Sequence, residues 1–297
     1  MAETALVTCA SGCVGRAFLR ILRERGVSVR AWIRDTAKAP SLGDAEVVIG
    51  DLFDPAICRR ACAGVATVIH IPPRVYPTGD QAHQLAEHCR SHSETTRRLL
   101  AAGEAAGARR FLYISSAHAG LPTPYGIAKR EAERCIEAHA AQWSAAVILR
   151  PPSIYGDGDK GILTPLKKAA VRGLPLPLRG IAARHSIVFA DDLARAGWRL
   201  LEAPMTDGSA RTFVIKDPDD YSPEELYEAC CRSLAKSARC FWLPQWILRR
   251  VRPFPVFLRA QCYSGEAFAA RHPDFRFTPL LAALGKSLNH LATIHAP

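Results

Sequence analysis

A strand, a tight glycine turn and a helix open the chain, and this unit constrains the fold more than any other stretch. Residues 5–7 form a short apolar run suited to a buried parallel strand, and apolar residues recur at the helical period over 14–22, before Gly26. Gly12 and Gly15 lie between them. Backbone N–H groups and the positive helix dipole at such a turn favour an anion such as a pyrophosphate. The turn is a candidate dinucleotide cradle, although glycines at this spacing also serve plain helix–strand packing.

Strand and helix patterns then alternate along the chain. The sequence predicts further strands at 27–33, 45–49, 66–71, 110–115 and 145–149, and helices that begin at Asp54 and cover 81–106 and 123–140. Such alternation predicts an α/β fold of the Rossmann type, a doubly wound parallel sheet with helices on both faces. In these sheets ligands bind beyond the carboxyl ends of the strands.

Proline and glycine become frequent after residue 150, and a smaller lobe is expected to begin there. We predict a dinucleotide-binding domain over 1–150 and a C-terminal α/β lobe over 151–297 that binds substrate, with some segments returning to the first domain. The lobe is expected to hold helices at 162–172, 191–202 and 222–235 and a strand at 211–215. Residues 242–258 are apolar and basic in alternation, which indicates a helix packed on the lobe rather than a membrane-surface segment.

Composition excludes several classes of protein. Hydrophobic residues make up 48% and charged residues 23% of the 297 residues, and no apolar run approaches the length of a membrane span. With no export signal evident, we expect a soluble, cytoplasmic protein. The ten cysteines form no C-x-x-C pair, which indicates reduced thiols.

The net charge of +11 is compatible with an anionic substrate or with nucleic acid. No zinc-finger spacing or RNA-binding aromatic signature accompanies it, so we expect no nucleic-acid partner. His88 and His92 share one helical face and could form a metal pair, but no third ligand is evident. A solvated helix face is the favoured interpretation, and no metal is expected.

The candidate chemistry lies after the fifth predicted strand. Ser115 and Ser116 stand at its end, and Tyr125 and Lys129 lie four residues apart in the next helix. A tyrosine hydroxyl and a lysine ammonium on one face can interact, and a nearby cation is expected to lower the tyrosine pKa from about 10. Tyr125 would act as an acid/base, and Ser116 would bind the substrate oxygen. A tyrosine packed on a lysine stem is the plain alternative.

These motifs together resemble the extended short-chain dehydrogenase/reductase family, which contains nucleotide-sugar epimerases, dehydratases and ketoreductases. The resemblance covers nearly the whole chain and rests on Ser11-Gly-Cys-Val-Gly15, Gly50-Asp-Leu52, Val68-Ile-His70, Arg110-Phe-Leu-Tyr-Ile-Ser-Ser116, Tyr125-Gly-Ile-Ala-Lys129, Leu149-Arg-Pro-Pro-Ser-Ile-Tyr-Gly156 and Ala190-Asp-Asp-Leu-Ala194. It implies a nicotinamide-dependent enzyme that moves a hydride between nicotinamide C4 and a carbinol carbon.

The resemblance also implies roles for individual residues. Ser116, Tyr125 and Lys129 would be the catalytic triad, with Lys129 also holding the nicotinamide ribose. The remaining cofactor-binding residues would be Ser11, Gly12, Cys13, Val14, Gly15, Asp51, Leu52 and Pro151. Arg34 follows the second strand, where an arginine can pair with a 2′-phosphate, so we expect NADP as cofactor, with NAD left open by the adjacent Asp35.

The chain departs from the family pattern in four places. Cys9 replaces the first fingerprint glycine, which costs roughly 1 kcal/mol if that position needs a positive φ. His92 stands where the family often has an asparagine that supports the active site. Pro72-Pro73 replace small residues that line the nicotinamide channel, and the interval from Ser116 to Tyr125 is short.

The substrate is expected to be a small molecule, and two classes compete. Residues 161–180 and 184–187 are similar to nucleotide-sugar 4-epimerases and 4-ketoreductases, where Ser153 and Arg184 would contact a nucleotide-linked substrate; Arg184 could instead pair with an acidic neighbour. Residues 242–250 are similar to the hydroxysteroid and dihydroflavonol branch, which acts on apolar ketones. We expect a nucleotide sugar and a homodimer. A non-catalytic dinucleotide-binding regulator is a further alternative, and the intact Ser–Tyr–Lys set argues against it.

Overall fold

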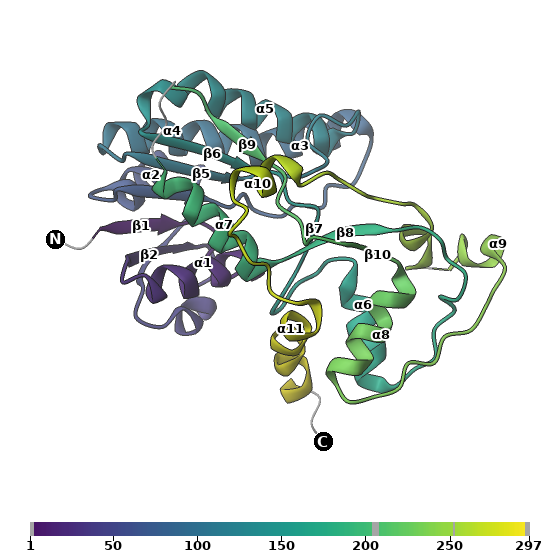
Figure 1. The fold of residues 1–297 in the computed structure, drawn as a ribbon. Helices are drawn as coiled ribbons and strands as arrows, with labels where there is room; N and C mark the ends of the chain where they lie inside the picture. The colour runs from purple at the N-terminus through teal and green to yellow at the C-terminus, as the bar shows by residue number, and fades with distance from the viewer. Residues whose placement is uncertain (1–2, 204–207, 252, 295–297) are drawn as a thin grey trace. The chain divides into compact units, whose positions relative to one another are not determined.

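The computed structural model describes residues 3–203, 208–251 and 253–294 (Figure 1). The chain divides into two compact units, Met1–Pro151 with Leu193–Val214, and Pro152–Asp192 with Ile215–Pro297. Most of α7 (Ala190–Glu202) and all of β9 (Arg211–Phe213) belong to the first unit. Both elements fall within the range 151–297, from which some segments were expected to return to the first domain, and β9 adds in parallel to the edge of the large sheet.

A seven-stranded sheet forms the centre of the first unit, in the order β3-β2-β1-β4-β5-β6-β9. Every adjacent pair is parallel, which confirms the predicted Rossmann-type fold. Leu6 of β1 lies opposite both Arg30 of β2 and Val68 of β4, so the strand order reverses direction at β1. The strands are β1 (Thr4–Val7), β2 (Ser28–Ile33), β3 (Glu46–Ile49), β4 (Thr67–His70), β5 (Arg110–Ile114), β6 (Ala145–Leu149) and β9.

Helices cover both faces of this sheet. On one face Gly197 of α7 approaches Leu112 and also Phe18 of α1 (Cys13–Glu24) so closely that a Cβ there would lie 2.8 and 3.2 Å from these side chains. The other face carries α2 (Pro55–Cys62), α4 (Thr95–Ala105) and α5 (Pro124–His139), whose buried residues share one core cluster with Leu6 and Val68. Alternate strand residues therefore serve opposite faces, as the pleat requires.

Local capping explains where the helices begin. The Asp54 carboxylate accepts a hydrogen bond from the Ala56 N–H at 2.8 Å, and the Thr123 hydroxyl accepts one from the Gly126 N–H at 3.0 Å. The helix expected over 81–106 is instead α3 (Gln81–Cys89), a π-helical turn at Arg90–Glu94, and α4. A π turn widens the helix by one residue and is frequent at functional sites.

The second unit contains a three-stranded sheet, in the order β10-β8-β7, with α6 (Leu163–Arg172), α8 (Pro223–Ser233) and α11 (Leu280–Ile294). Its strands β7 (Ser153–Tyr155), β8 (His185–Phe189) and β10 (Asp220–Tyr221) are short. Lys167 is buried in this unit, where its ammonium lies 2.9 Å from the Asp159 carboxylate. This ammonium also donates to the Ser287 hydroxyl at 2.5 Å, so the buried charge is paired.

Residues 242–258 do not form the expected helix. Among the described residues of this range, helical structure is limited to α9 (Gln245–Leu248) and a 3₁₀ turn at Phe254–Leu258, because Pro253 and Pro255 interrupt the segment. Leu248 and Phe257 are buried, so the segment does pack on its own unit. The short helix α10 (Glu266–Arg271) follows. Among the described residues, no helix is long and apolar enough to cross a membrane.

The turn between β1 and α1 is tightly closed. Cys9 has a φ of +49°, which confirms that the position of the first fingerprint glycine requires the left-handed region. A Cβ on Gly15 would lie 2.4 Å from the Cys9 carbonyl oxygen and 2.6 Å from the Ala10 Cα. Only glycine at residue 15 allows this approach.

The strain at Cys9 gives the first testable prediction. Cys9→Gly and Cys9→Ala both remove the sulfur, but only the glycine variant removes the Cβ penalty of the left-handed backbone. We expect Cys9→Gly to be more stable than Cys9→Ala by about 1 kcal/mol, measured as free energy of unfolding in urea. Equal stability of the two variants would show that the turn relaxes to another conformation.

Candidate active site

The predicted catalytic residues meet at the carboxyl end of β5. Ser116 follows this strand, and Tyr125 and Lys129 lie on successive turns of α5. The loop between them folds directly onto the start of α5, because a Cβ on Gly126 would lie 2.6 Å from the carbonyl oxygens of His118 and Leu121. The short interval therefore brings Ser116 and Tyr125 together without a longer connecting loop.

The side chain of Ser116 lies near the Tyr125 hydroxyl, where it acts to lower the pKa of Tyr125. The Ser116 hydroxyl accepts a hydrogen bond from the His118 N–H at 3.1 Å, which orients it. Burial raises the pKa of Tyr125, and Ser116 and the charge of Arg74 only partly oppose that rise. The expectation that Lys129 lowers this pKa is wrong for the ligand-free protein, since removal of the phenol from water dominates.

Lys129 is held in a nearly dry environment. Its side chain is 3% exposed, and its ammonium donates to the Ile114 carbonyl at 3.0 Å. The ammonium lies 5.7 Å from the centre of the Tyr125 ring. Burial lowers the pKa of Lys129 to about 7, although the charge of Glu133 favours the protonated form. The lysine can therefore lose or gain its proton near neutral pH.

Glu133 lies on the same helix and is fully buried. Arg150 binds it through two hydrogen bonds of 2.5 and 2.8 Å, and Ser115 donates to it at 2.6 Å. These partners lower the pKa of Glu133 against the effect of burial, so it is a carboxylate. Ser115 thus fixes the position of α5 against β5. Because its hydroxyl donates to Glu133, Ser116 is the serine that remains available to contact a substrate.

Two histidines flank Tyr125. The rings of His88 and His92 stack 5.6 Å apart, and each presents an edge-on contact to the Tyr125 ring at 5.5 Å. They are 8% and 3% exposed, so the interpretation as a solvated helix face is wrong. The π turn places both rings inward. Burial lowers the pKa of both, which leaves neutral imidazoles beside the phenol. No group of metal ligands forms among the described residues.

A third histidine lies deeper in this unit. His70 Nδ1 is 3.1 Å from the Thr8 hydroxyl, and its Nε2 is 3.5 Å from the Thr95 hydroxyl. Burial lowers its pKa to about 3, so this ring is neutral at pH 7. The sequence marked His70 only as part of a family motif. It gave no signal that His88 would contact Tyr125.

The predicted cofactor residues lie at the carboxyl ends of β1, β2, β3 and β6. Gly12 caps α1 without a side chain and donates its own N–H to the Cys9 carbonyl at 3.0 Å, so after Ser11 and Gly12 the backbone N–H groups of the first helical turn are those of Cys13, Val14 and Gly15. Arg34 is exposed directly after β2, whereas the Asp35 carboxylate accepts from the Ala37 N–H at 3.1 Å and caps the next turn.

The other predicted cofactor contacts follow β3 and β6. The Asp51 carboxylate accepts from the Phe53 N–H at 3.0 Å and holds the turn that buries Leu52. The Pro151 carbonyl accepts from the Ala117 N–H at 2.8 Å, next to Ser116.

Burial raises the pKa of Cys9 to about 11, and the positive charges of Arg34, Lys129 and Lys38 oppose that rise. This region is therefore electropositive, which suits a dinucleotide.

Ser153 and Arg184 belong to the second unit. Ser153 opens β7 and is partly buried. The Arg184 guanidinium donates to the Asp220 carbonyl and lies 3.4 Å from the Glu225 carboxylate, and its side chain is about half exposed. This geometry is the pairing with an acidic neighbour that the sequence left open.

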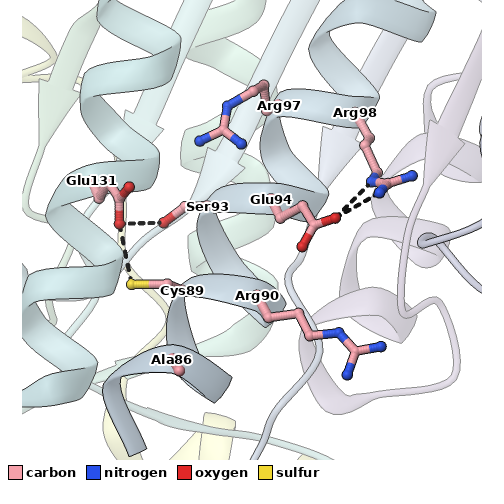
Figure 2. Close-up of a pocket in the computed structure, with 8 residues that line it drawn as sticks. All are labelled: Ala86, Cys89, Arg90, Ser93, Glu94, Arg97, Arg98 and Glu131. Atoms are coloured by element: carbon pink, nitrogen blue, oxygen red, sulfur yellow. Dashed lines mark hydrogen bonds and ion pairs between the residues drawn. The ribbon is translucent and has the colours of Figure 1, made fainter. Parts of the chain in front are cut away.

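A cavity of about 590 Å³ on the first unit is lined by residues of α3, the π turn, α4 and α5 (Figure 2). Cys89 and Ser93 donate hydrogen bonds to Glu131 at 3.1 and 3.2 Å along one side, and Arg98 pairs with Glu94 at 2.6 Å on the other. None of the predicted site residues lines it. The cavity is a charged surface groove and is not the catalytic centre.

Known proteins resemble this chain along most of its length. It is 32% identical over 80% of its residues to a ceramide reductase of Caulobacter vibrioides, and covers 73% of that protein. It is 30% identical over 76% of its residues to a 3β-hydroxysteroid dehydrogenase/Δ5→4-isomerase of Mycobacterium tuberculosis, and covers 69% of it. The solved structure of MoeE5 with UDP-glucuronic acid and NAD superposes with a TM-score of 0.77 at 21% identity, with coverage of 98% of this chain and 100% of MoeE5.

The family model of the NAD dependent epimerase/dehydratase family matches residues 5–215. This range contains the β1–α1 turn, the β5 serines and the Tyr125–Lys129 pair described above. The chain therefore belongs to the NAD dependent epimerase/dehydratase family.

Proposed function

We propose that this member of the family is an NAD(P)-dependent oxidoreductase that interconverts a secondary alcohol and a ketone on an apolar substrate, with Ser116, Tyr125 and Lys129 as its catalytic residues. The observation that carries the proposal is the grouping of Ser116 and Tyr125 with the buried Lys129, whose ammonium lies 5.7 Å from the centre of the Tyr125 ring. This arrangement stands at the carboxyl ends of parallel strands, where such sheets bind ligands.

The residues of the β1–α1 turn fit a dinucleotide. The uncapped start of α1 offers N–H donors, and the close approach at Gly15 leaves a cradle that a Cβ would fill. Arg34 adds an exposed cation at the end of β2, where a 2′-phosphate would lie. These features support NADP as the preferred cofactor. Asp35, which lies next to Arg34 and accepts a hydrogen bond from the Ala37 N–H, leaves binding of NAD open.

The chemistry of the site follows from proton transfer. When bound, the nicotinamide ring supplies the hydride to the carbonyl carbon or accepts it from the carbinol carbon. Tyr125 gives its proton to the carbonyl oxygen during reduction and takes it back during oxidation, while Ser116 donates a hydrogen bond to the same oxygen. Because burial raises the pKa of Tyr125, the hydroxyl is protonated at neutral pH. This state suits reduction of a ketone.

Two observations favour an apolar substrate. The ceramide reductase and the 3β-hydroxysteroid dehydrogenase, whose names imply lipid-like substrates, are 32% and 30% identical to this chain. Arg184, the proposed cation for a nucleotide diphosphate, already pairs with Glu225. A nucleotide sugar is the second candidate, and the sequence pattern over 161–187 supports it. The likeness to MoeE5, at 21% identity, supports the shared fold alone.

The first test combines a substrate screen with a variant that removes only the proton donor. We expect nicotinamide absorbance changes with long-chain or steroidal ketones, and a fall in kcat of at least about 100-fold in Tyr125→Phe with unchanged cofactor affinity. Tyr221→Phe, which removes a hydroxyl in the second unit, should retain activity. Turnover of UDP- or dTDP-sugars alone would favour the second candidate, and near-normal turnover by Tyr125→Phe would refute the assigned role.

The pKa of Lys129 predicts how cofactor affinity depends on pH. Its pKa is about 7 without ligand, and an anionic dinucleotide favours the charged form and raises this pKa. The affinity should therefore be greatest below pH 7 and fall as pH rises from about 7 toward the higher pKa of the complex, by up to about tenfold per pH unit. Titration calorimetry at pH 6 to 8.5 measures this, and Lys129→Met should show no such slope. An equal slope in both proteins would assign the effect to another group.

The position of Arg34 predicts which of the two cofactors, NADP or NAD, binds more tightly. Loss of a guanidinium–phosphate pair in Arg34→Ala should weaken NADP(H) binding about tenfold or more and leave NAD(H) binding unchanged. Arg59→Ala, which removes an exposed arginine on α2, is the matched control. If wild-type protein binds both cofactors equally and Arg34→Ala changes neither, the preference for NADP is wrong.

A further inference from the structure

The second unit exposes a group of large apolar side chains on one segment. We name this the aromatic patch; it consists of Phe241, Trp242, Trp246, Val251 and Val256. Trp242 and Trp246 are 63% and 62% exposed, whereas Trp32, Trp143 and Trp198 are each at most 3% exposed. Tryptophan is highly buried on average in globular proteins, so two exposed residues four positions apart indicate a binding surface.

The segment that carries the patch is anchored. Phe241 donates its N–H to the Leu176 carbonyl at 3.0 Å, and its own carbonyl accepts from the Arg179 N–H at 3.1 Å. Leu248 and Phe257 are buried beneath the segment and join the core of this unit. Leu243 and Phe254 also pack against this core, so the backbone is held in place and the exposure of the patch residues is a feature of the fold.

The segment that carries the patch has charge of a single sign, while Glu224 and Glu228 of α8 lie near Cys240 at its start. Residues 229–265 contain seven lysines and arginines and no aspartate or glutamate. Arg249 and Arg250 are exposed next to Trp246, and the Arg250 guanidinium lies 5.7 Å from the centre of the Trp246 indole. An exposed aromatic surface within an arginine-rich segment is the pattern of a membrane-interface site, where indole rings lie at the headgroup level.

We propose that the aromatic patch docks on the surface of an anionic lipid bilayer. A second copy of the chain is disfavoured as the occupant, because two identical basic segments would repel one another. Nucleic acid matches the charge and could stack on the three aromatic rings, but it would leave the aliphatic side chains of Val251 and Val256 without an apolar partner. A bilayer accommodates all of these groups, since the apolar side chains enter the acyl boundary and the arginines bind anionic headgroups. The proposal rests on the patch alone and is independent of the substrate.

Intrinsic tryptophan fluorescence can test this contact directly. The full-length protein is mixed with vesicles of phosphatidylcholine, or of phosphatidylcholine with 30 mol% phosphatidylglycerol, with and without brominated acyl chains. Because the other three tryptophans are buried, bromine quenching should report on Trp242 and Trp246. We expect binding and partial quenching with the anionic vesicles at low salt, weaker binding with the neutral vesicles, and loss of quenching in Trp242→Ala/Trp246→Ala.

The charge contribution needs its own matched pair of variants. Arg249→Gln/Arg250→Gln should lower the partition coefficient for anionic vesicles by more than about tenfold. Arg59→Gln/Arg109→Gln has the same net charge but alters exposed arginines of the first unit, and should bind as the wild type does. Thermal unfolding of all variants checks that the fold is retained, which is expected because each altered side chain is exposed.

Three outcomes would overturn the proposal. One is an absence of quenching in the wild type with anionic vesicles, and another is equal loss of binding in the two arginine double variants. The third is a different occupant of the patch. Light scattering that shows a dimer converted to monomer by Trp242→Ala/Trp246→Ala would assign the patch to a second copy, and displacement of the vesicles by a single-stranded oligonucleotide would assign it to nucleic acid.

Discussion

The contact between the start of α1 and the turn after β1 determines much of the first unit. Gly15 lies against the Cys9 carbonyl with no room for a side chain, and Cys9 adopts a left-handed backbone to allow this approach. β1 pairs with both β2 and β4, so the turn lies at the centre of the sheet, at the point where the strand order reverses. The helix start and the strand ends must therefore face the same small region, which is where a dinucleotide fits.

Burial controls the chemistry around Tyr125. The same removal from water raises the pKa of Tyr125, lowers the pKa of Lys129 to about 7 and keeps His88 and His92 neutral. Glu133 is the exception, because Arg150 and Ser115 satisfy its oxygens and keep it charged. The fixed charge that acts on the phenol is that of Arg74, and a bound anion would decide the protonation of Lys129.

The sequence predicted the first unit well because its signals are local. Hydrophobic periodicity located the parallel strands, and caps such as Asp54 and Thr123 located the helix starts. Interactions between distant segments were not predictable in this way. The sequence could not show that β9 joins β6, or that a π turn directs His88 and His92 onto Tyr125. It misjudged the pKa of Tyr125 because spacing reveals a nearby cation but not the degree of burial.

The surroundings of the catalytic phenol bear on the substrate. Reduction of an isolated ketone needs one proton donor and one hydrogen-bond donor to the carbonyl oxygen, the roles proposed for Tyr125 and Ser116. A nucleotide sugar also brings a diphosphate, and binding it requires cations that are not already neutralised. Arg184 is about half exposed and pairs with Glu225, so recruitment of this side chain would first break an ion pair. Neutral His88 and His92 against the phenol add no charge of their own, which is consistent with the apolar ketone proposed above.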